Sequence, residues 1–311
     1  MEQLSLMLLY LGAICMVIAF IALVVHATLL ATASRSPVAV FGTTLAAAGA
    51  GGGSATIGAS GGPTSAASAT TAGGIGQAMT WATVILFGLS LAIRGYLEGR
   101  GPWGNMFEFT AAFAFGVVAG YLYLGRRYPI RAIGFLPLGV ALFLTAYAIS
   151  LPTGIEPLVP ALSNPELLTV HVLMAIISYG IFATSFGAAV AYLAQGPNDR
   201  YSWLPSHKVL DEVAYRAVIV GFPIFATLII LGSWWASIAW GRYWGWDPIE
   251  TSALTTWLIY AVYLHARNLK GWAGRPAALI LVVGFGGILF TYFGLEFFNN
   301  SLHAYSGLPV Q

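Results

Sequence analysis

A cluster of tryptophans is the most unusual local feature of the sequence. The chain has 10 Trp, and half of them fall within thirteen consecutive positions: Trp234, Trp235, Trp240, Trp244 and Trp246. Indole rings gather at membrane–water interfaces, so the cluster is typical of an interfacial belt. A belt, however, spreads its aromatics over several helix ends. One segment that holds five rings with two interleaved glycines, Gly241 and Gly245, also fits a platform for a flat apolar ligand, and both interpretations stay open.

Acidic residues follow the tryptophans directly. Asp247, Pro248 and Glu250 have the spacing of an N-cap, a first helical residue and a third helical residue, which predicts a capped helix start. Asn105 and Glu108 have the same spacing. Capping alone accounts for side chains in such positions, and contact with a ligand is the alternative.

Three of the 5 histidines lie where an iron ligand is expected. His171 is near the start of one apolar stretch and His303 follows the last, so the two flank the Trp-rich segment. Imidazole is a usual axial ligand of haem iron, and a bis-His site needs two rings on opposite faces of the macrocycle. His265 lies about 17 residues beyond Pro248, roughly 25 Å along a helix, and an ionisable group at that depth is a functional candidate.

Each histidine also has a simpler interpretation. His171 and His303 are compatible with plain interfacial residues, and His265 with a side chain that snorkels to the membrane surface. His26, at a similar depth in the first apolar stretch, is interpreted as structural. His207, in a charged loop, is interpreted as a solvated residue.

The composition indicates what kind of protein must position these residues. Of 311 residues, 58% are hydrophobic and 8% charged, and the mean hydropathy is +0.80. Soluble domains carry about 25% charged residues, so a polytopic membrane protein is expected. A net charge of +2, with no basic tract, excludes a nucleic-acid partner. Cys15 is the single cysteine, which excludes an internal disulfide and a CxxC redox pair.

Eight apolar stretches are long enough to span a membrane as helices. They are 6–32, 76–94, 107–125, 131–150, 167–194, 213–236, 249–268 and 276–296. We therefore expect an all-α fold, a polytopic membrane bundle of about eight transmembrane helices with an external Trp-rich loop. The first stretch is expected to be a span, because no positively charged segment of the kind that begins a signal peptide precedes it.

Three regions follow from this pattern. Residues 1–35 contain the first transmembrane helix. Residues 36–78 are rich in Gly, Ala, Ser and Thr, which predicts a flexible linker. Residues 79–311 form the main membrane domain and contain the candidate ligands.

The distribution of Lys and Arg predicts the orientation. Alternating spans put ten of the 13 basic residues on one face, which the positive-inside rule makes cytoplasmic. Both termini are then external, as are the loops 95–106, 151–166 and 237–248. The Trp-rich segment, His171 and His303 are all expected at this external face.

The sequence WGRYWGWDPIET from Trp240 to Thr251, followed by YLHAR from Tyr263 to Arg267, resembles the WWD signature of cytochrome c assembly proteins. Within that family the chain is most similar to the CcsA/ResC type of system II cytochrome c biogenesis. Further matches are GNMFE from Gly104, HV at His171 and LHAY from Leu302. The resemblance covers roughly residues 80 to 305, so 79–311 is expected to be the haem-binding assembly domain.

The resemblance implies haem b as ligand and substrate. His171 and His303 correspond to the family's external axial ligands, and His265 corresponds to a membrane-embedded histidine that binds haem on its way outward. The platform residues that the resemblance implies are Trp240, Trp244, Trp246, Asp247 and Glu250.

The implied function is that of the haem-binding subunit of a system II cytochrome c synthase. Such a subunit moves haem across a plasma or thylakoid membrane and presents it to the CxxCH motif of apocytochrome c. The implied partner is a ResB subunit, also called CcsB. No side chain resembles a nucleophile or general base acting on the substrate, so whether this chain is itself an enzyme of the haem lyase type stays open. The alternatives are a haem exporter without ligation activity and a membrane cytochrome b.

Two positions depart from the family's usual pattern. Ile249 stands where Lys is usual, which removes a cation for a haem propionate and leaves Arg242 or a residue of the partner as a substitute. Phe107 stands where Tyr is common. Neither position is an expected iron ligand.

Overall fold

The computed structural model describes residues 1–34, 63–155, 165–267, 269 and 272–297. Within these ranges all regular structure is helical. The elements are α1 (Glu2–Ala33), α2 (Pro63–Glu98), α3 (Met106–Gly125), η1 (Arg131–Ile133), α4 (Phe135–Ser150), α5 (Pro165–Ala194), α6 (His207–Trp240), α7 (Pro248–Arg267) and α8 (Arg275–Phe297). The expectation of an all-α helical bundle is confirmed.

Seven of the described helices are long and apolar enough to cross a membrane. The exception is α7, whose 20 residues are long enough for about 30 Å but include many Thr and Tyr side chains besides His265 and Arg267. It packs against α6 and α8 in the same bundle. The chain is therefore an integral membrane protein with multiple spans, and one of its eight expected spans is unusually polar.

The start of α2 differs from the expected boundary at residue 78. The helix begins at Pro63, a residue type favoured at the first helical position, so it extends into the Gly/Ala-rich segment. There it packs on α1, where Nδ1 of His26 lies 2.7 Å from the carbonyl oxygen of Ala69. A Cβ at Gly73 would lie 2.8 Å from the same nitrogen. Small residues that offer little surface for a core thus let two helices approach closely. The part of the expected linker before Pro63 lies outside the described residues.

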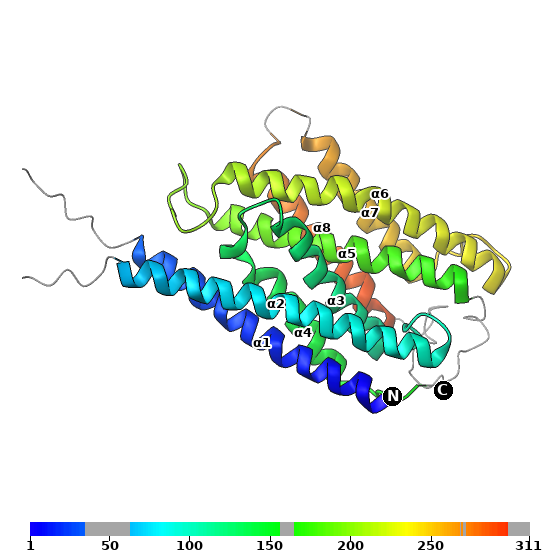
Figure 1. The fold of residues 1–311 in the computed structure, drawn as a ribbon. Coiled ribbons are helices and arrows are strands. Elements are labelled where there is room, and N and C mark those ends of the chain that lie inside the picture. The colour runs from blue at the N-terminus through cyan, green and yellow to red at the C-terminus, as the bar shows by residue number, and fades with distance from the viewer. Residues whose placement is uncertain (35–62, 156–164, 268, 270–271, 298–311) are drawn as a thin grey trace, which may run out of the picture.

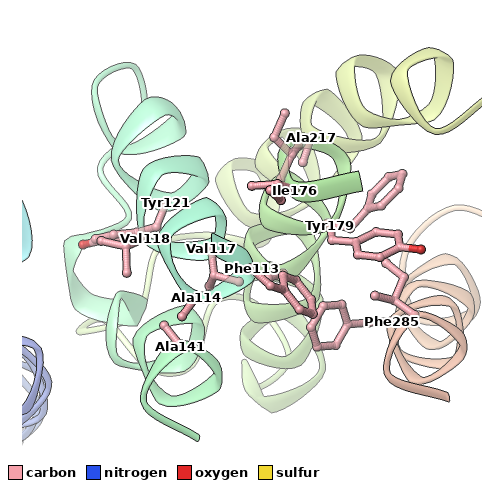
Figure 2. Packing of buried hydrophobic residues seen from close by; sticks show 14 of the residues in the cluster. Phe113, Ala114, Val117, Val118, Tyr121, Ala141, Ile176, Tyr179, Ala217 and Phe285 are labelled. Carbon is pink, nitrogen blue, oxygen red and sulfur yellow. The ribbon is translucent and has the colours of Figure 1, made fainter. Parts of the chain in front are cut away.

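The centre of the bundle is α3, which is buried along most of its length. A Cβ at Gly116 would lie 2.6 Å from the carbonyl oxygen of Ile176 on α5, and a Cβ at Gly180 would collide with the carbonyl oxygen of Gly116. The two backbones therefore touch, as at other small-residue contacts between membrane helices. Figure 2 shows the buried side chains around this contact, among them Phe113 and Val117.

The helix ends divide into two groups. Residue 1 and the loops 99–105 and 241–247 lie at the same end of the bundle (Figure 1). We name it the pocket end, because a cavity lies between these loops and the adjoining helices. The connection between α5 and α6, the end of α7 and the start of α8 lie at the other end.

Candidate functional site

A pocket is present at the pocket end of the bundle. It holds about 1220 Å³ of empty space, part of which is open to the surroundings. Its walls come from α3, α5, α6, α7 and α8 and are mostly apolar, which is typical of sites for small molecules. The lining residues include Trp103, Gly104, Asn105, Met106, Phe109, His171, Gly232, Trp240, Trp244, Ile249, Glu250 and Tyr292.

The imidazole of His171 lines this pocket from α5. Its Nδ1 lies 3.0 Å from the carbonyl oxygen of Leu228 on α6. A carbonyl oxygen only accepts, so Nδ1 of the neutral ring donates and Nε2 carries the lone pair that a metal uses. A Cβ at Gly232 would lie 2.8 Å from Cε1 of His171, so the glycine makes room for the ring. The structure therefore fixes both the place and the tautomer of this imidazole.

The tryptophan cluster divides into two groups. Trp240 and Trp244 line the pocket, and Trp240 lies edge-on against the buried Trp235 with ring centroids 4.8 Å apart. Trp246 has the left-handed φ of 57° and is 71% exposed, while Trp234 is 54% exposed. Some indoles are thus placed as walls of a binding site, and others have the exposure of an interfacial belt.

Asp247 and Glu250 form a capping box at the start of α7. Oδ2 of Asp247 accepts the N–H of Ile249 at 3.0 Å. Oε2 of Glu250 accepts the N–H groups of Gly245 at 2.8 Å and of Asp247 at 3.2 Å. Capping therefore accounts for these hydrogen bonds of both acids. It also fixes the loop that carries Trp244, and Glu250 in addition lines the pocket.

A second capping box stands at the start of α3. Oδ1 of Asn105 accepts the N–H of Glu108 at 2.9 Å, and Oε2 of Glu108 accepts the N–H of Gly104 at 2.9 Å. Here the acid has a further partner, because Oε1 of Glu108 accepts from Nη2 and Nε of Arg94 at 2.8 and 3.1 Å. The guanidinium of Arg94 also lies over the ring of Phe107, 5.1 Å from its centroid. Phe107 is thus a packing residue of this cap.

The structure does not place His265 in the pocket. Its side chain is exposed on the outer surface of α7, about 12 residues and roughly 18 Å along the helix from Ala253, which lines the pocket. His303 lies outside the described residues.

The remaining histidines have local partners. His26 is buried against α2. His207 starts α6, and both its Nδ1 and its backbone N–H lie 2.7 Å from Oδ1 of Asp199. The hydrogen bond from this backbone N–H lowers the pKa of Asp199. Neither histidine lines the pocket.

Several pocket residues were not singled out from the sequence. Trp103, Phe109 and Tyr292 line the pocket, and the ring of Tyr292 stacks on Phe109 with centroids 5.7 Å apart. The hydroxyl of Tyr292 contacts Oγ1 of Thr110. These contacts join α3 to α8, which are far apart in sequence, so no local pattern marks them. The one indication in the sequence was the position of Trp103, two residues before the predicted cap Asn105.

Comparison with known proteins identifies the family. Residues 103–303 match the family described as Cytochrome C assembly protein, which is well over half of the chain. The chain belongs to this family. The matched range contains the pocket and begins after α2, so the resemblance seen in the sequence is confirmed for the part of the chain that carries the site.

Individual relatives carry the description "Cytochrome c biogenesis protein CcsA". That of Pyropia yezoensis is 30% identical over 286 residues, which cover 76% of this chain and 89% of the relative. That of Porphyra purpurea is 33% identical over 271 residues, with coverage of 72% and 84%. That of Chlamydomonas reinhardtii is 34% identical over 243 residues, with coverage of 74% and 68%. The chain is a CcsA-type cytochrome c biogenesis protein.

Proposed function

We propose that this protein binds haem in the pocket and presents it for covalent attachment to apocytochrome c, as a subunit of a system II cytochrome c synthase. The observation that carries the proposal is the oriented imidazole of His171 in a pocket walled by Trp240 and Trp244. Imidazole ligates haem iron, and flat aromatic rings pack well against a planar macrocycle.

The residues present fit a haem group in several respects. The walls are apolar, the Nε2 lone pair of His171 is of the kind that iron accepts, and His303 is the proposed second axial ligand. Ile249 in the wall offers no cation to a propionate. The side chain of Arg242 lies across Gly245, where a Cβ would be 2.8 Å from its Nε, so it stands on the same loop as Trp244 but does not line the pocket. A cation for a propionate is therefore proposed to come from Arg242 or from a residue of the partner.

The proposed platform residues have different tasks. Trp240 and Trp244 contact the macrocycle, and Asp247 and Glu250 hold the loop through their backbone hydrogen bonds. Trp246 faces outward from that loop, where an arriving apocytochrome would meet it. This assignment rests on the exposure of each side chain and on which of them line the pocket.

The chemistry requires positioning more than it requires a reactive side chain. Each thiol of a CxxCH motif adds its S–H across one haem vinyl group, so that sulfur bonds to one carbon and the hydrogen goes to the other. This addition consumes no oxidant or reductant. A site that fixes the iron and shields the macrocycle from water supplies rate through proximity and orientation.

The exposed His265 suggests where haem passes before it reaches the pocket. An ionisable group on the outer surface of a helix in a membrane bundle is a functional candidate by default. We assign that face of α7 to the ResB/CcsB-type subunit, with His265 as a haem ligand on the path outward.

Charge supports an external pocket end in a plasma or thylakoid membrane, with both termini external. The basic residues at the pocket end are Arg94, Arg100 and Arg242. Those of the described residues assigned to the opposite, cytoplasmic end are more numerous, in accord with the positive-inside rule: Arg126, Arg127, Arg131, Arg200, Lys208, Arg216, Arg267 and Arg275.

The test is the absorption spectrum of the full-length protein purified in detergent with its ResB-type partner. Wild type is expected to contain low-spin haem, and His171→Ala and His303→Ala to change its spectrum. His207→Ala is the matched control, because His207 is bound to Asp199 away from the pocket. Wild type without haem, or identical spectra for all variants, would contradict the proposal.

A second measurement separates ligation from export. The complex is expressed in a host that lacks other cytochrome c assembly systems, together with a reporter apocytochrome that carries one CxxCH motif. Haem that stays on the reporter after denaturation shows ligation. Haem delivered to the external side without attachment shows an exporter.

A further inference from the structure

The ion pair between Arg94 and Glu108 joins the start of α3 to a helix that lies before the range matched by the family. Arg94 belongs to α2, and its guanidinium binds Glu108 at 2.8 Å through Nη2. The two side chains are 1% and 0% exposed. A charge pair buried to this degree contributes little net stability, because desolvation of both ions offsets their attraction. The ion pair is therefore more important for where it holds the two side chains than for its contribution to stability.

The ion pair reaches the pocket through the second carboxylate oxygen of Glu108. That oxygen accepts the N–H of Gly104. A Cβ at Gly104 would collide with the guanidinium of Arg100, which itself binds Glu98 at 2.6 Å. The four consecutive residues 103–106 all line the pocket. The carboxylate of Glu108 thus links the pocket wall 103–106 to the buried guanidinium of Arg94.

The same cluster holds residues 153 and 154, which follow the end of α4. Nη2 of Arg94 also donates to the carbonyl oxygen of Thr153 at 3.0 Å. Nδ2 of Asn105 donates to the carbonyl oxygen of Gly154 at 3.1 Å. Arg94 is therefore bound directly to the residues that follow α4, and through Glu108 to the wall 103–106.

We infer that Arg94 and Glu108 are positioning residues of the haem pocket, which set the wall 103–106 against the macrocycle ligated by His171. The inference rests on the proposed function and extends the site to α2. The planar fork of Arg94 suits this task, because its two bonds to one carboxylate oxygen and one to a carbonyl fix direction as well as distance. Lysine offers a charge without that fork.

The experiment compares Arg94→Gln, Glu108→Gln and the double variant R94Q/E108Q in the full-length protein with its partner. The double variant carries two neutral side chains that can hydrogen-bond to each other. It is expected to accumulate where a single variant leaves the buried cluster of Arg94, Arg100, Glu98 and Glu108 with unequal numbers of cations and acids. Arg94→Lys keeps the charge and serves as the second variant. Asp211→Asn is the control, because it removes an ion pair to Arg267 at the opposite end.

Two readouts separate positioning from folding. One is the ligand-field signature of the haem iron in absorption and electron paramagnetic resonance spectra, and the other is the rate at which apomyoglobin removes the haem. For R94Q/E108Q and Arg94→Lys we expect an altered signature and about 10- to 100-fold faster haem loss, as when groups that orient a metal ligand are removed. Asp211→Asn should match wild type in both.

The outcomes distinguish this inference from the proposed function. If wild-type haem depends on His171 while an accumulating R94Q/E108Q or Arg94→Lys protein keeps the wild-type signature and haem-loss rate, the inference is overturned and the proposed function stands. If wild type holds no haem that depends on His171, the proposed function fails, and the positioning role fails with it. An altered signature in a folded variant, with Asp211→Asn unchanged, supports the inference.

Discussion

The two helix starts that border the pocket share one pattern of capping and differ in what surrounds it. At α3 and at α7 a glutamate three residues after the cap reaches back to a backbone N–H. Glu108 is also bound by the buried Arg94, whereas Glu250 forms no ion pair with any residue that the structure describes, and it lines the pocket. The same capping sequence therefore gives a buried, ion-paired glutamate at the start of α3 and a glutamate that reaches the pocket at the start of α7. Arg94, a cation from the preceding helix α2, makes the difference.

The largest effect on stability is expected when the ion pair between Arg94 and Glu108 is broken. Glu108→Gln removes the carboxylate that pairs with the buried guanidinium of Arg94 and leaves Glu98, which is paired with Arg100, as the remaining acid of the cluster. Breaking a buried ion pair in this way costs about 3–5 kcal/mol of unfolding free energy. The thermal unfolding of the detergent-solubilised protein and its level in the membrane measure this loss. If Glu108→Gln and Glu250→Gln lowered the unfolding temperature equally, the distinction between the two caps would be wrong.

A smaller loss of stability is expected at the other cap. Glu250→Gln keeps an oxygen for the N–H of Gly245, so unfolding free energy should fall by no more than about 1 kcal/mol. The haem spectrum should change nevertheless, because the side chain lines the pocket and fixes the loop with Trp244. Spectra and unfolding curves recorded on the same sample test both parts. An unchanged spectrum would show that Glu250 is a cap and nothing more.

A substitution at Gly232, which belongs to neither cap, tests the role of His171 separately from the two caps. Gly232→Ala gains about 1 kcal/mol of helix propensity, and its new Cβ would lie 2.8 Å from Cε1 of His171, so the net change in stability should be small. The imidazole must move, and the haem spectrum should shift. Gly286→Ala, where a Cβ would meet nothing within 4 Å, is the matched control on α8. Identical spectra for the two variants would argue against His171 as a ligand.

The smallest effect is expected at a third helix start, at the opposite end of the bundle. Asp199 accepts the N–H of His207 at the beginning of α6, and this bond lowers the pKa of Asp199. A carboxyl group with a lowered folded-state pKa stabilises the fold above its ordinary pKa of about 4, and the contribution is lost as the pH falls through the lowered value. Asp199→Asn should therefore reduce the loss of stability on acidification. Unfolding temperatures measured between neutral pH and about pH 3 test this, and parallel curves for wild type and variant would contradict it.

The helices were largely predictable from the sequence, because a membrane demands long apolar segments. The predicted spans 107–125 and 249–268 agree with α3 and α7 to within one residue at each end. The start of α2 was missed because packing on His26, a tertiary contact, stabilises a helix in residues that composition assigns to a linker. The start of α6 was placed too late, since charged residues such as Lys208 continue the helix beyond the apolar stretch.

The site was predictable in its types of residue more than in its arrangement. Alternating spans placed His171 and the Trp-rich loop at one end of the bundle, where the structure also has them. The contact between Tyr292 and α3 depends on how non-adjacent helices pack, and the approach of Arg94 to Glu108 depends on how the loop between α2 and α3 folds. Sequence periodicity carries no information on such contacts. The structure likewise shows which indoles face the pocket, a question that residue types alone leave open.

The backbone contact between α3 and α5 has a mechanical consequence. Because the carbonyl of Gly116 lies against Gly180, backbone contact fixes the distance between α3 and α5 at this point. The helix packed against α5 on its other side from this contact is α6, and it contains Pro223, which removes one hydrogen bond of the helix and weakens it at that point. A change of angle at Pro223 would therefore also move the carbonyl of Leu228 and the backbone of Gly232, which hold the imidazole of His171 in the pocket.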